Sequence, residues 1–516
     1  MKRKLLHAVA GSLLILAGKP AFSQTAKATI GKETDLVISK HIYGQFAEHL
    51  GRGIYDGFWV NSAMPVKKQD RIRLDVVEAL KKIKIPNLRW PGGCFADEYH
   101  WRDGIGLRAN RPKMVNTNWG GVTEDNSFGT HEFLELCKLL NTEPYISGNV
   151  GSGTVQEMSN WVEYLNFDGK SPLTDLRAKN GHPKPYNVTF WGVGNESWGC
   201  GGNMTPEYYS DEYKRYAIFA KDYGDNKLKK IATGPAGDNY NWTEVVMKNV
   251  KKDMWGIALH YYTLPTGSWT GSKGSATKFT EDAYFNTLKN GLKMEEFVTK
   301  HSAIMDKYDP EKKMALVVDE WGVWTDSEPG TNPGFLYQQN SLRDALVAAS
   351  TLNIFNNHAD RVKLANLAQT INVLQALILT QKEKIILTPT YHVFDMYKVH
   401  QDAKLLPIKL DVPDYEFDGK KLPAVNVSAS KDASGKIHLT IVNIDNHKAI
   451  DFKADLGDVA WTTVTGQILT GTNVTNINTF ANPNNIKLVA FNDAKKDGSN
   501  ISVKLPAHSV VSLELK

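Results

Sequence analysis

Two glutamates at the ends of apolar stretches are the residues of this sequence best placed to do chemistry. Residues 190–195 lead directly to Glu196, and residues 315–319 lead in the same way to Glu320. A poorly solvated carboxylic acid can donate its proton to a leaving oxygen, and a second, ionised carboxylate can act as a nucleophile. Glu196 alone could merely cap the following turn, but two carboxylates together are what glycosidic bond hydrolysis requires. We therefore predict that Glu196 is the acid/base and Glu320 the nucleophile of a retaining glycoside hydrolase, with carboxyl groups about 5 to 5.5 Å apart.

A parallel barrel would bring these two strand ends together. From about residue 40 to 380, short apolar β-type runs alternate with longer helical patterns, which is typical of βα units on a parallel sheet. Eight such units most economically close into a (β/α)8 TIM barrel, whose catalytic side chains gather at the carboxyl ends of the strands. The eight strands are expected to end near Ala47, Trp90, Gly148, Asn195, Gly234, His260, Glu320 and Gln369.

The pattern changes to a period of two after about residue 385. Ile437, Leu439 and Ile441, for example, alternate with His438 and Thr440, which predicts antiparallel strands of a jelly-roll-like β-sandwich. The expected organisation is therefore a signal peptide (1–23), N-terminal strand residues that join the sandwich (24–40), the catalytic barrel (41–384) and the sandwich domain (385–516).

The N-terminus resembles a secretory leader. Three basic residues at positions 2–4 precede an apolar stretch over residues 5–17, and Ala21-Phe22-Ser23 is a small-residue cleavage signal. A membrane anchor would need about 20 apolar residues, which this stretch does not reach. We therefore expect cleavage near Ser23, a secreted or periplasmic protein, and no membrane association afterwards.

Charge and motifs argue against several other function classes. The net charge is only +5, from 61 basic and 56 acidic residues, and no block of five or six Lys or Arg suggests a nucleic-acid partner. His131 and Glu132 begin a helical stretch that lacks the second histidine of a zinc helix, and no glycine-rich phosphate loop follows a strand. We expect neither a metal nor a cofactor, and hydrolysis by two carboxylates needs neither.

Six short motifs, read together and in order, resemble one known family over most of the chain. They are Gly44-Gln45-Phe46-Ala47-Glu48-His49, Arg89-Trp90-Pro91-Gly92-Gly93-Cys94-Phe95, Gly194-Asn195-Glu196, His260-Tyr261-Tyr262-Thr263, Asp319-Glu320-Trp321 and Thr388-Pro389-Thr390-Tyr391. The sequence is similar in these motifs to the retaining α-L-arabinofuranosidases of glycoside hydrolase family 51. The resemblance implies release of non-reducing-end α-L-arabinofuranosyl residues from arabinan, arabinoxylan or derived oligosaccharides, and an oligomer of identical barrels such as a hexamer.

The resemblance also implies roles for polar residues at the barrel mouth. Glu48 would hold sugar hydroxyls, Arg89 would support the nucleophile, and Asn195 would bind a hydroxyl beside the acid. Gln369 would supply a sugar-binding amide at the end of the eighth strand. The alternative is that Glu48, Arg89 and Gln369 merely form a polar network at the mouth.

Three further side chains are implied at the two carboxylates. Tyr262 would donate a hydrogen bond to Glu320, His260 would lie near both glutamates, and Trp324 would form a hydrophobic wall. The alternatives are that His260 is a structural histidine and that Trp324 belongs to the core.

Cys94 marks a departure from the family pattern. It is expected to line the substrate site where some family members carry Asn, although a thiol is a poor hydrogen-bond partner. Cys200 follows Glu196 by four residues and would lie on the same face. The two cysteines could form a disulfide or remain free buried thiols, depending on the distance between them.

Two other functions stay open at this stage. Barrels with carboxylates on strands four and seven serve many sugars, so a retaining β-glycanase or β-xylosidase is one alternative. A non-catalytic polysaccharide-binding protein on a hydrolase scaffold is the other, although the presence of both glutamates argues against it.

Overall fold

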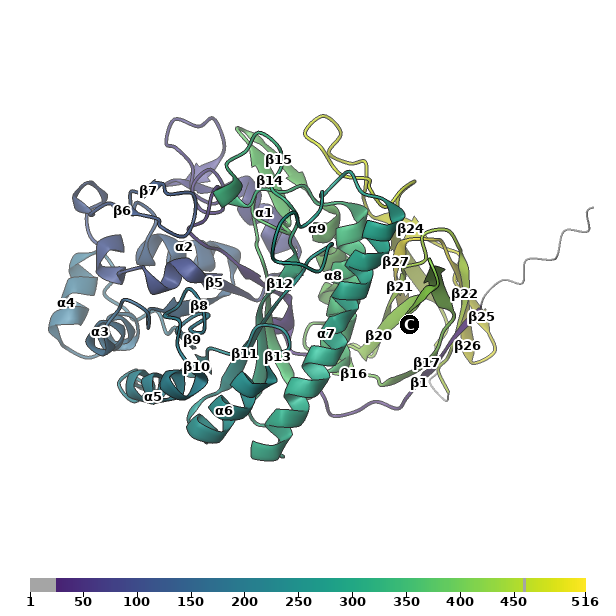
Figure 1. Ribbon diagram of the computed structural model, residues 1–516, viewed down its shortest axis with the longest axis horizontal. Coiled ribbons are helices and arrows are strands. Elements are labelled where there is room, and N and C mark those ends of the chain that lie inside the picture. Colours follow the sequence, from purple (N-terminus) through teal and green to yellow (C-terminus); the bar gives the residue numbers. More distant parts are fainter. Residues whose placement is uncertain (1–24, 458–460) are drawn as a thin grey trace, which may run out of the picture.

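The computed structural model describes residues 25–457 and 461–516, and its centre is a closed barrel of eight parallel strands (Figure 1). The strands follow one another in chain order around the barrel. They are β2 (Gly44–Phe46), β5 (Asn87–Trp90), β8 (Glu143–Gly148), β9 (Phe190–Val193), β10 (Lys229–Ala232), β11 (Gly256–Thr263), β12 (Ala315–Val323) and β13 (Val362–Leu367). The barrel and the C-terminal antiparallel sheets described below confirm the predicted fold class.

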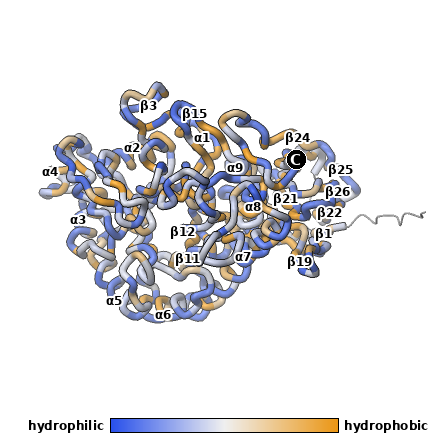
Figure 2. Tube along the Cα trace, turned by 45° about the horizontal axis from the view of Figure 1, so that its top comes forward, coloured by the Kyte–Doolittle hydropathy of each residue, from blue (hydrophilic) through white to orange (hydrophobic). Residues whose placement is uncertain are grey.

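Nine α-helices are present in the described part of the chain, and most of them surround the barrel. They are α1 (Leu74–Lys82), α2 (Thr130–Leu140), α3 (Val155–Asn166), α4 (Pro172–Lys179), α5 (Pro206–Ala217), α6 (Tyr240–Val250), α7 (Glu281–Tyr308), α8 (Leu342–Asn357) and α9 (Pro389–Tyr397). Hydrophilic and hydrophobic residues alternate along the outer helices (Figure 2). In α6, for example, Trp242, Val246 and Val250 recur every four residues and are buried, as expected of a helix that covers a sheet.

Two sheets form the sandwich beside the barrel. The first has the order β17-β1-β22-β26-β25 and the second the order β16-β20-β21-β27-β23-β24. Their bounds are β1 (Thr25–Ile30), β16 (Lys404–Leu405), β17 (Ile408–Asp411), β20 (Val425–Lys431), β21 (Ile437–Asn443), β22 (Ile450–Asp455), β23 (Val464–Leu469), β24 (Val489–Phe491), β25 (Lys495–Asp497), β26 (Asn500–Leu505) and β27 (Ser509–Leu515). Strand β1, from the start of the described chain, lies between β17 and β22 and runs parallel to β22.

Helix α8 separates the barrel from the second sheet of the sandwich, and nearly all of it is buried. Its Asn353 accepts hydrogen bonds from Ser428 and Thr440, at 2.8 Å each. His400 lies close by, with one ring nitrogen 2.7 Å from the Ser430 hydroxyl and the other 3.0 Å from that of Thr440. The two domains are therefore joined by a buried network of uncharged polar side chains.

Four short hairpins of the described chain lie outside the barrel and the sandwich. They are β3 (Lys68–Gln69) with β4 (Ile72–Arg73), β6 (Met114–Val115) with β7 (Thr123–Glu124), β14 (Ile378–Gln381) with β15 (Lys384–Leu387), and β18 (Asp414–Phe417) with β19 (Lys420–Pro423). Within the described ranges, no helix has both the length and the apolar character needed to cross a membrane. The expected signal peptide, residues 1–23, lies outside the described residues.

Candidate active site

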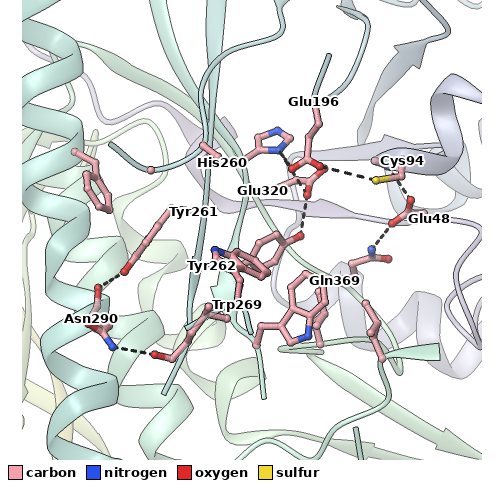
Figure 3. A pocket seen from close by; sticks show the side chains of 18 of the residues that line it. Glu48, Cys94, Glu196, His260, Tyr261, Tyr262, Trp269, Asn290, Glu320 and Gln369 are labelled. Carbon is pink, nitrogen blue, oxygen red and sulfur yellow. Dashed lines mark hydrogen bonds and ion pairs between the residues drawn. The ribbon is translucent and has the colours of Figure 1, made fainter. Parts of the chain in front are cut away.

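The barrel mouth encloses a cavity of about 570 Å³, which is a typical volume for a ligand pocket (Figure 3). Most of the side chains that were expected in the site line it, since the carboxyl ends of parallel strands meet there. These are Glu48, Cys94, Glu196, His260, Tyr262, Glu320, Trp324 and Gln369. Arg89 and Asn195 are also buried at the mouth, but they lie behind the two carboxylates rather than on the wall of this cavity.

The two glutamates face each other across His260. Glu196 Oε1 is 2.9 Å from His260 Nδ1, and the same nitrogen is 3.6 Å from Glu320 Oε2. One oxygen of each carboxylate and one ring nitrogen of His260 all lie within 4.8 Å of one another. The site therefore holds two carboxyl groups close enough to act on a single bond.

Glu320 is held by one hydrogen bond on each oxygen. Arg89 donates to its Oε1 and the Tyr262 hydroxyl donates to its Oε2, both at 2.8 Å. Arg89 in turn donates to the Asn195 side-chain oxygen at 2.6 Å. A guanidinium on one oxygen and a hydroxyl on the other fix the orientation of this carboxylate. Gly93 leaves room for this group, since a Cβ there would lie 2.8 Å from Glu320 Oε1.

A register shift in β12 points two consecutive carboxylates into the same site. Ala258 pairs with Val317 on one side of the shift and His260 with Glu320 on the other, so β12 has one residue more than β11 over this stretch. Such a bulge changes the direction in which side chains point. Asp319 consequently contacts the site as Glu320 does, with its carboxylate 3.2 Å from His260 Nε2 and 3.5 Å from Arg89 Nε.

His260 is a buried cation in this arrangement. Burial by itself lowers the pKa of an imidazole, but the charge of Glu320 and the hydrogen bonds with Asp319 and Glu196 outweigh it and raise the pKa of His260 to about 10. Both ring nitrogens then carry a proton, so that one donates to Glu196 and the other to Asp319.

Glu196 has the environment of an acid that keeps its proton. Burial raises its pKa, the charge of Glu320 adds to this effect, and the hydrogen bond with His260 opposes it without reversing it. Its backbone has a φ of 39°, which non-glycine residues adopt infrequently and which is often found at functional sites. Glu196 is thus suited to donate a proton, whereas Glu320 is suited to attack.

Glu48 and Gln369 form a second polar group beside the carboxylate pair. Glu48 accepts hydrogen bonds from the Gln369 amide at 2.8 Å and from the Trp119 indole at 2.9 Å. Burial and the charge of Glu320 raise the pKa of Glu48 to about 7. Oxygen acceptors and an amide at one end of the cavity can recognise the hydroxyl groups of a sugar.

Aromatic side chains form another wall of the cavity. The Trp324 ring meets Tyr262 edge to face with ring centres 5.0 Å apart, and it meets Trp269 in the same manner at 5.4 Å. Trp269 is 59% exposed, so the wall extends from buried Glu320 to the surface. Trp324 therefore lines the cavity and also packs against the buried hydrophobic side chains beside it.

Cys94 and Cys200 form a disulfide, with Cα atoms 5.5 Å apart. The sulfur of Cys200 is 3.5 Å and that of Cys94 3.9 Å from Glu196 Oε2. The disulfide therefore lies beside the Glu196 carboxyl group at the mouth of the cavity.

Several residues of the site were not identified from the sequence. Asp319 was read only as part of a motif, and Tyr145, which donates to Asp319 at 2.6 Å, appeared as an ordinary strand residue. Trp119 and Trp269 come from irregular loops, where no periodicity indicates which way a side chain points. Their only signal was the abundance of aromatic residues in the chain.

Comparisons with known proteins agree with this geometry. The family model described as "Alpha-L-arabinofuranosidase 1 domain" matches residues 79–281, and "Alpha-L-arabinofuranosidase C-terminal domain" matches residues 319–509. An intracellular exo-α-L-arabinofuranosidase of Bacteroides ovatus is 52% identical, with all of both chains covered. A crystal structure of the GH51 arabinofuranosidase of Xanthomonas axonopodis pv. citri is 50% identical, has a TM-score of 0.93, and matches 96% of this chain and 100% of its own. The chain belongs to the family 51 α-L-arabinofuranosidases.

More distant members of the arabinofuranosidase family have the same architecture. The α-L-arabinofuranosidase of Thermotoga maritima, solved as an arabinose complex, is 32% identical with a TM-score of 0.83 over 95% of this chain and 99% of its own. A family 44 xyloglucanase of Paenibacillus polymyxa is only 11% identical, with a TM-score of 0.60, and shares the fold alone. The resemblance inferred from the sequence motifs is thus confirmed.

The comparisons correct one expectation about this arabinofuranosidase. The Bacteroides ovatus relative is named intracellular although it matches the chain over its whole length. The expectation of a secreted or periplasmic protein with a leader cleaved near Ser23 is therefore wrong. A basic start followed by a short apolar stretch meets the compositional criteria of a leader, but composition does not establish that the segment is recognised and cleaved.

Proposed function

We propose that this family 51 member is a retaining, exo-acting α-L-arabinofuranosidase. It would release non-reducing-end α-L-arabinofuranosyl residues from arabinan, arabinoxylan or derived oligosaccharides. The observation that carries the proposal is the carboxylate pair Glu196 and Glu320, with oxygens within 4.8 Å of each other. Inverting glycosidases need about 6.5–9.5 Å between carboxyl groups to seat a water, whereas retaining ones need about 5–5.5 Å. Exo action is supported by the name of the Bacteroides ovatus relative.

In the first step, Glu320 attacks the anomeric carbon and Glu196 gives its proton to the departing oxygen. The hydrogen bonds from Arg89 and Tyr262 hold both oxygens of Glu320 in place for the attack. The raised pKa of Glu196 favours its protonated form, which is the form that donates to the departing oxygen. The product of this step is a covalent glycosyl-enzyme.

In the second step, Glu196 acts as the base. Once Glu320 is esterified it no longer carries a negative charge, so the repulsion that raises the pKa of Glu196 disappears. Glu196 then takes a proton from water, which attacks the same carbon and releases the sugar with its original configuration. The change of role of Glu196 thus follows from its coupling to Glu320.

His260 and Asp319 would keep the acid in position. The imidazolium donates a hydrogen bond to Glu196 and is itself anchored by Asp319. Its charge restrains the pKa of Glu196 from rising further. We therefore assign His260 as a positioning residue that sets the pH range over which Glu196 works.

We assign the polar and aromatic walls to sugar recognition. Glu48 and Gln369 would bind hydroxyl groups of the terminal sugar, and Trp324 would contact its apolar face. Asn195 lies behind Glu196 and would act indirectly, by accepting a hydrogen bond from Arg89 and so fixing the guanidinium that holds Glu320. Cys94 borders this site through its disulfide and offers a nonpolar contact rather than a hydrogen bond.

Two measurements test the proposal. Rates on 4-nitrophenyl α-L-arabinofuranoside and β-D-xylopyranoside should favour the arabinofuranoside, and digestion of branched arabinan should give free arabinose. Proton NMR of the first-formed sugar should show the α-anomer. Preferential xylosidase activity, or initial release of the β-anomer, would refute the proposed substrate or the proposed mechanism respectively.

We also propose an oligomer of identical barrels, a hexamer or a smaller even assembly, on the basis of the family resemblance alone. Sedimentation at working concentration tests it, and a monomer would contradict it.

A further inference from the structure

We propose that reduction of the Cys94–Cys200 disulfide turns the mouth of the active site into an inhibitory site for a soft divalent cation such as Zn²⁺. The ligands would be the two thiolates and Glu196 Oε2. One potential ligand atom from each of these three residues already lies within 4.8 Å of the other two. This property lies beyond hydrolysis itself, and binding of the cation does not depend on the proposed substrate.

The distances from the carboxylate to the two sulfurs suit a tetrahedral site. Glu196 Oε2 is 3.5 Å from Cys200 Sγ and 3.9 Å from Cys94 Sγ. With zinc–sulfur and zinc–oxygen bonds of about 2.3 and 2.1 Å, two such ligands of a tetrahedral zinc lie about 3.6 Å apart. Only the two sulfurs must separate, to about 3.8 Å on the same geometry, and this happens once their bond is broken.

The surroundings would orient the ligand carboxylate and leave a route for the cation. Glu196 Oε1 is engaged by His260 at 2.9 Å, which leaves Oε2 directed at the sulfurs. Ligands held by such a second hydrogen bond bind metals more tightly. Cys200 is exposed at the mouth of the cavity, so a cation can enter from solvent and keep water as its fourth ligand.

The chemistry needs a reductant, which we take to be a thiol. Two thiol molecules supply two electrons and two protons, the sulfur–sulfur bond is cleaved to two cysteine thiols, and the reductant leaves as its own disulfide. Zn²⁺ then displaces both thiol protons and binds as the dithiolate complex. Soft thiolates favour zinc over magnesium or calcium, which prefer oxygen ligands.

Zinc at this position would stop the reaction because it would bind Glu196 Oε2, an oxygen of the carboxyl group that transfers the proton in both steps. A carboxylate bound to the cation can neither hold the proton for the first step nor accept one in the second. The disulfide would therefore protect the acid/base, and the reduced enzyme would be the zinc-sensitive form. Disulfides are usually reduced inside cells. The redox state of the compartment would therefore decide whether the zinc-resistant or the zinc-sensitive form of the enzyme is present.

Cobalt spectroscopy tests binding without using substrate. Full-length protein, reduced with a thiol that is then removed anaerobically, is titrated with Co²⁺ beside the oxidised protein. We expect a thiolate-to-cobalt charge-transfer band in the reduced sample only. Cys137 is a free, buried thiol in both samples, so a band confined to the reduced one comes from the Cys94–Cys200 pair. Equal spectra for the two redox states would overturn the proposal.

Two variants locate the site. Cys200→Ser should lose the charge-transfer band, whereas Cys137→Ala, which keeps the pair, should retain it. A cobalt spectrum unchanged by Cys200→Ser would overturn the assignment. The comparison of reduced with oxidised wild-type protein needs no variant, so it remains decisive if either variant fails to fold.

Inhibition is measured as a ratio to the metal-free rate of the same sample. Half inhibition of the reduced enzyme should need at least about tenfold less Zn²⁺ than that of the oxidised enzyme, and a chelator should restore the rate. Equal sensitivity of the two forms would overturn the inhibitory role. If the protein forms the cobalt complex but cleaves no arabinofuranoside, the proposed function is contradicted, whereas the proposed metal site is still supported.

Discussion

His260 at the barrel mouth and His400 beneath the sandwich are both buried, yet their pKa values are shifted in opposite directions. Both ring nitrogens of His260 face carboxylates, and its pKa is raised to about 10. Both ring nitrogens of His400 face hydroxyl groups, and burial together with the nearby His438 lowers its pKa to about 3. Burial opposes charge at both positions, so it is the buried carboxylates that make the imidazole at the mouth a cation.

The two shifts affect stability in different pH ranges. His260 has a folded pKa above its ordinary 6.5, so the stability that it contributes is complete below about 6.5 and is lost as the pH rises through about 10. His400 has a folded pKa below 6.5, so its contribution is present above 6.5 and is lost as the pH falls towards 3. The charged network around His260 lies in the candidate active site, whereas the neutral network around His400 and Asn353 lies between the barrel and the sandwich.

Removal of the nucleophile should have the largest effect. Glu320→Ala removes the carboxylate that would attack the anomeric carbon. The rate of hydrolysis should therefore fall by roughly 10⁴-fold or more whatever the leaving group. Azide can then attack directly, and NMR should identify a glycosyl azide of inverted configuration. The exposed Glu207→Ala is the matched control and should keep the wild-type rate. Substantial hydrolysis by Glu320→Ala would exclude its role.

Removal of the acid/base should depend on the leaving group. Glu196→Ala should slow poor leaving groups by up to roughly 10⁴-fold but affect nitrophenolate far less, because a good leaving group departs without a proton. The second step still lacks its base, so the intermediate should accumulate. Azide should then rescue turnover and give a product of retained configuration. If the two azide products are exchanged between the variants, the roles of Glu196 and Glu320 must be exchanged.

Replacement of the buried cation should change the pH profile. His260→Asn removes the positive charge that restrains the pKa of Glu196, so that pKa should rise. Because Glu196 acts first as an acid, the basic limb of kcat/KM should move to higher pH, with a loss of about 10²-fold at the optimum. His400→Asn is the control and should leave this limb in place. An unchanged basic limb in His260→Asn would rule out the positioning role.

The neutral histidine should matter for stability alone. His400→Asn cannot reach both the Ser430 and the Thr440 hydroxyl, so it should lower the free energy of unfolding by about 1–3 kcal/mol. Urea denaturation at pH 7 and pH 5 should also show a smaller loss on acidification than in the wild type. An altered kcat/KM in the folded variant would contradict the separation of the two networks.

The sequence was most informative where strands end. Glu196 and Glu320 could be placed because apolar stretches lead to them, and barrel geometry then brings them together. Asp319 could not be placed in the same way, because successive side chains of a regular β-strand point to opposite faces of the sheet. Only the register shift in β12, visible once strand pairing is known, brings both into the site.

Other features depend on contacts that no local pattern encodes. Trp119 reaches Glu48 from an irregular loop, and pairing of Cys94 with Cys200 required the distance between two strand ends. Family resemblance identified Glu48 and Gln369 without revealing that they hydrogen-bond each other. Export was predicted from a basic start, an apolar stretch and a small-residue cleavage signal, and this prediction was wrong.

The position of β1 in the sandwich affects the order in which the chain can fold. The partners of β1, β17 and β22, are both synthesised much later than β1 itself. While the ribosome is still making the barrel, β1 therefore has no sheet to join, and the face of α8 that later meets the sandwich is uncovered. Unpaired strand edges and exposed apolar faces promote aggregation. The nascent chain is therefore expected to be most prone to aggregation until the C-terminal strands have been synthesised.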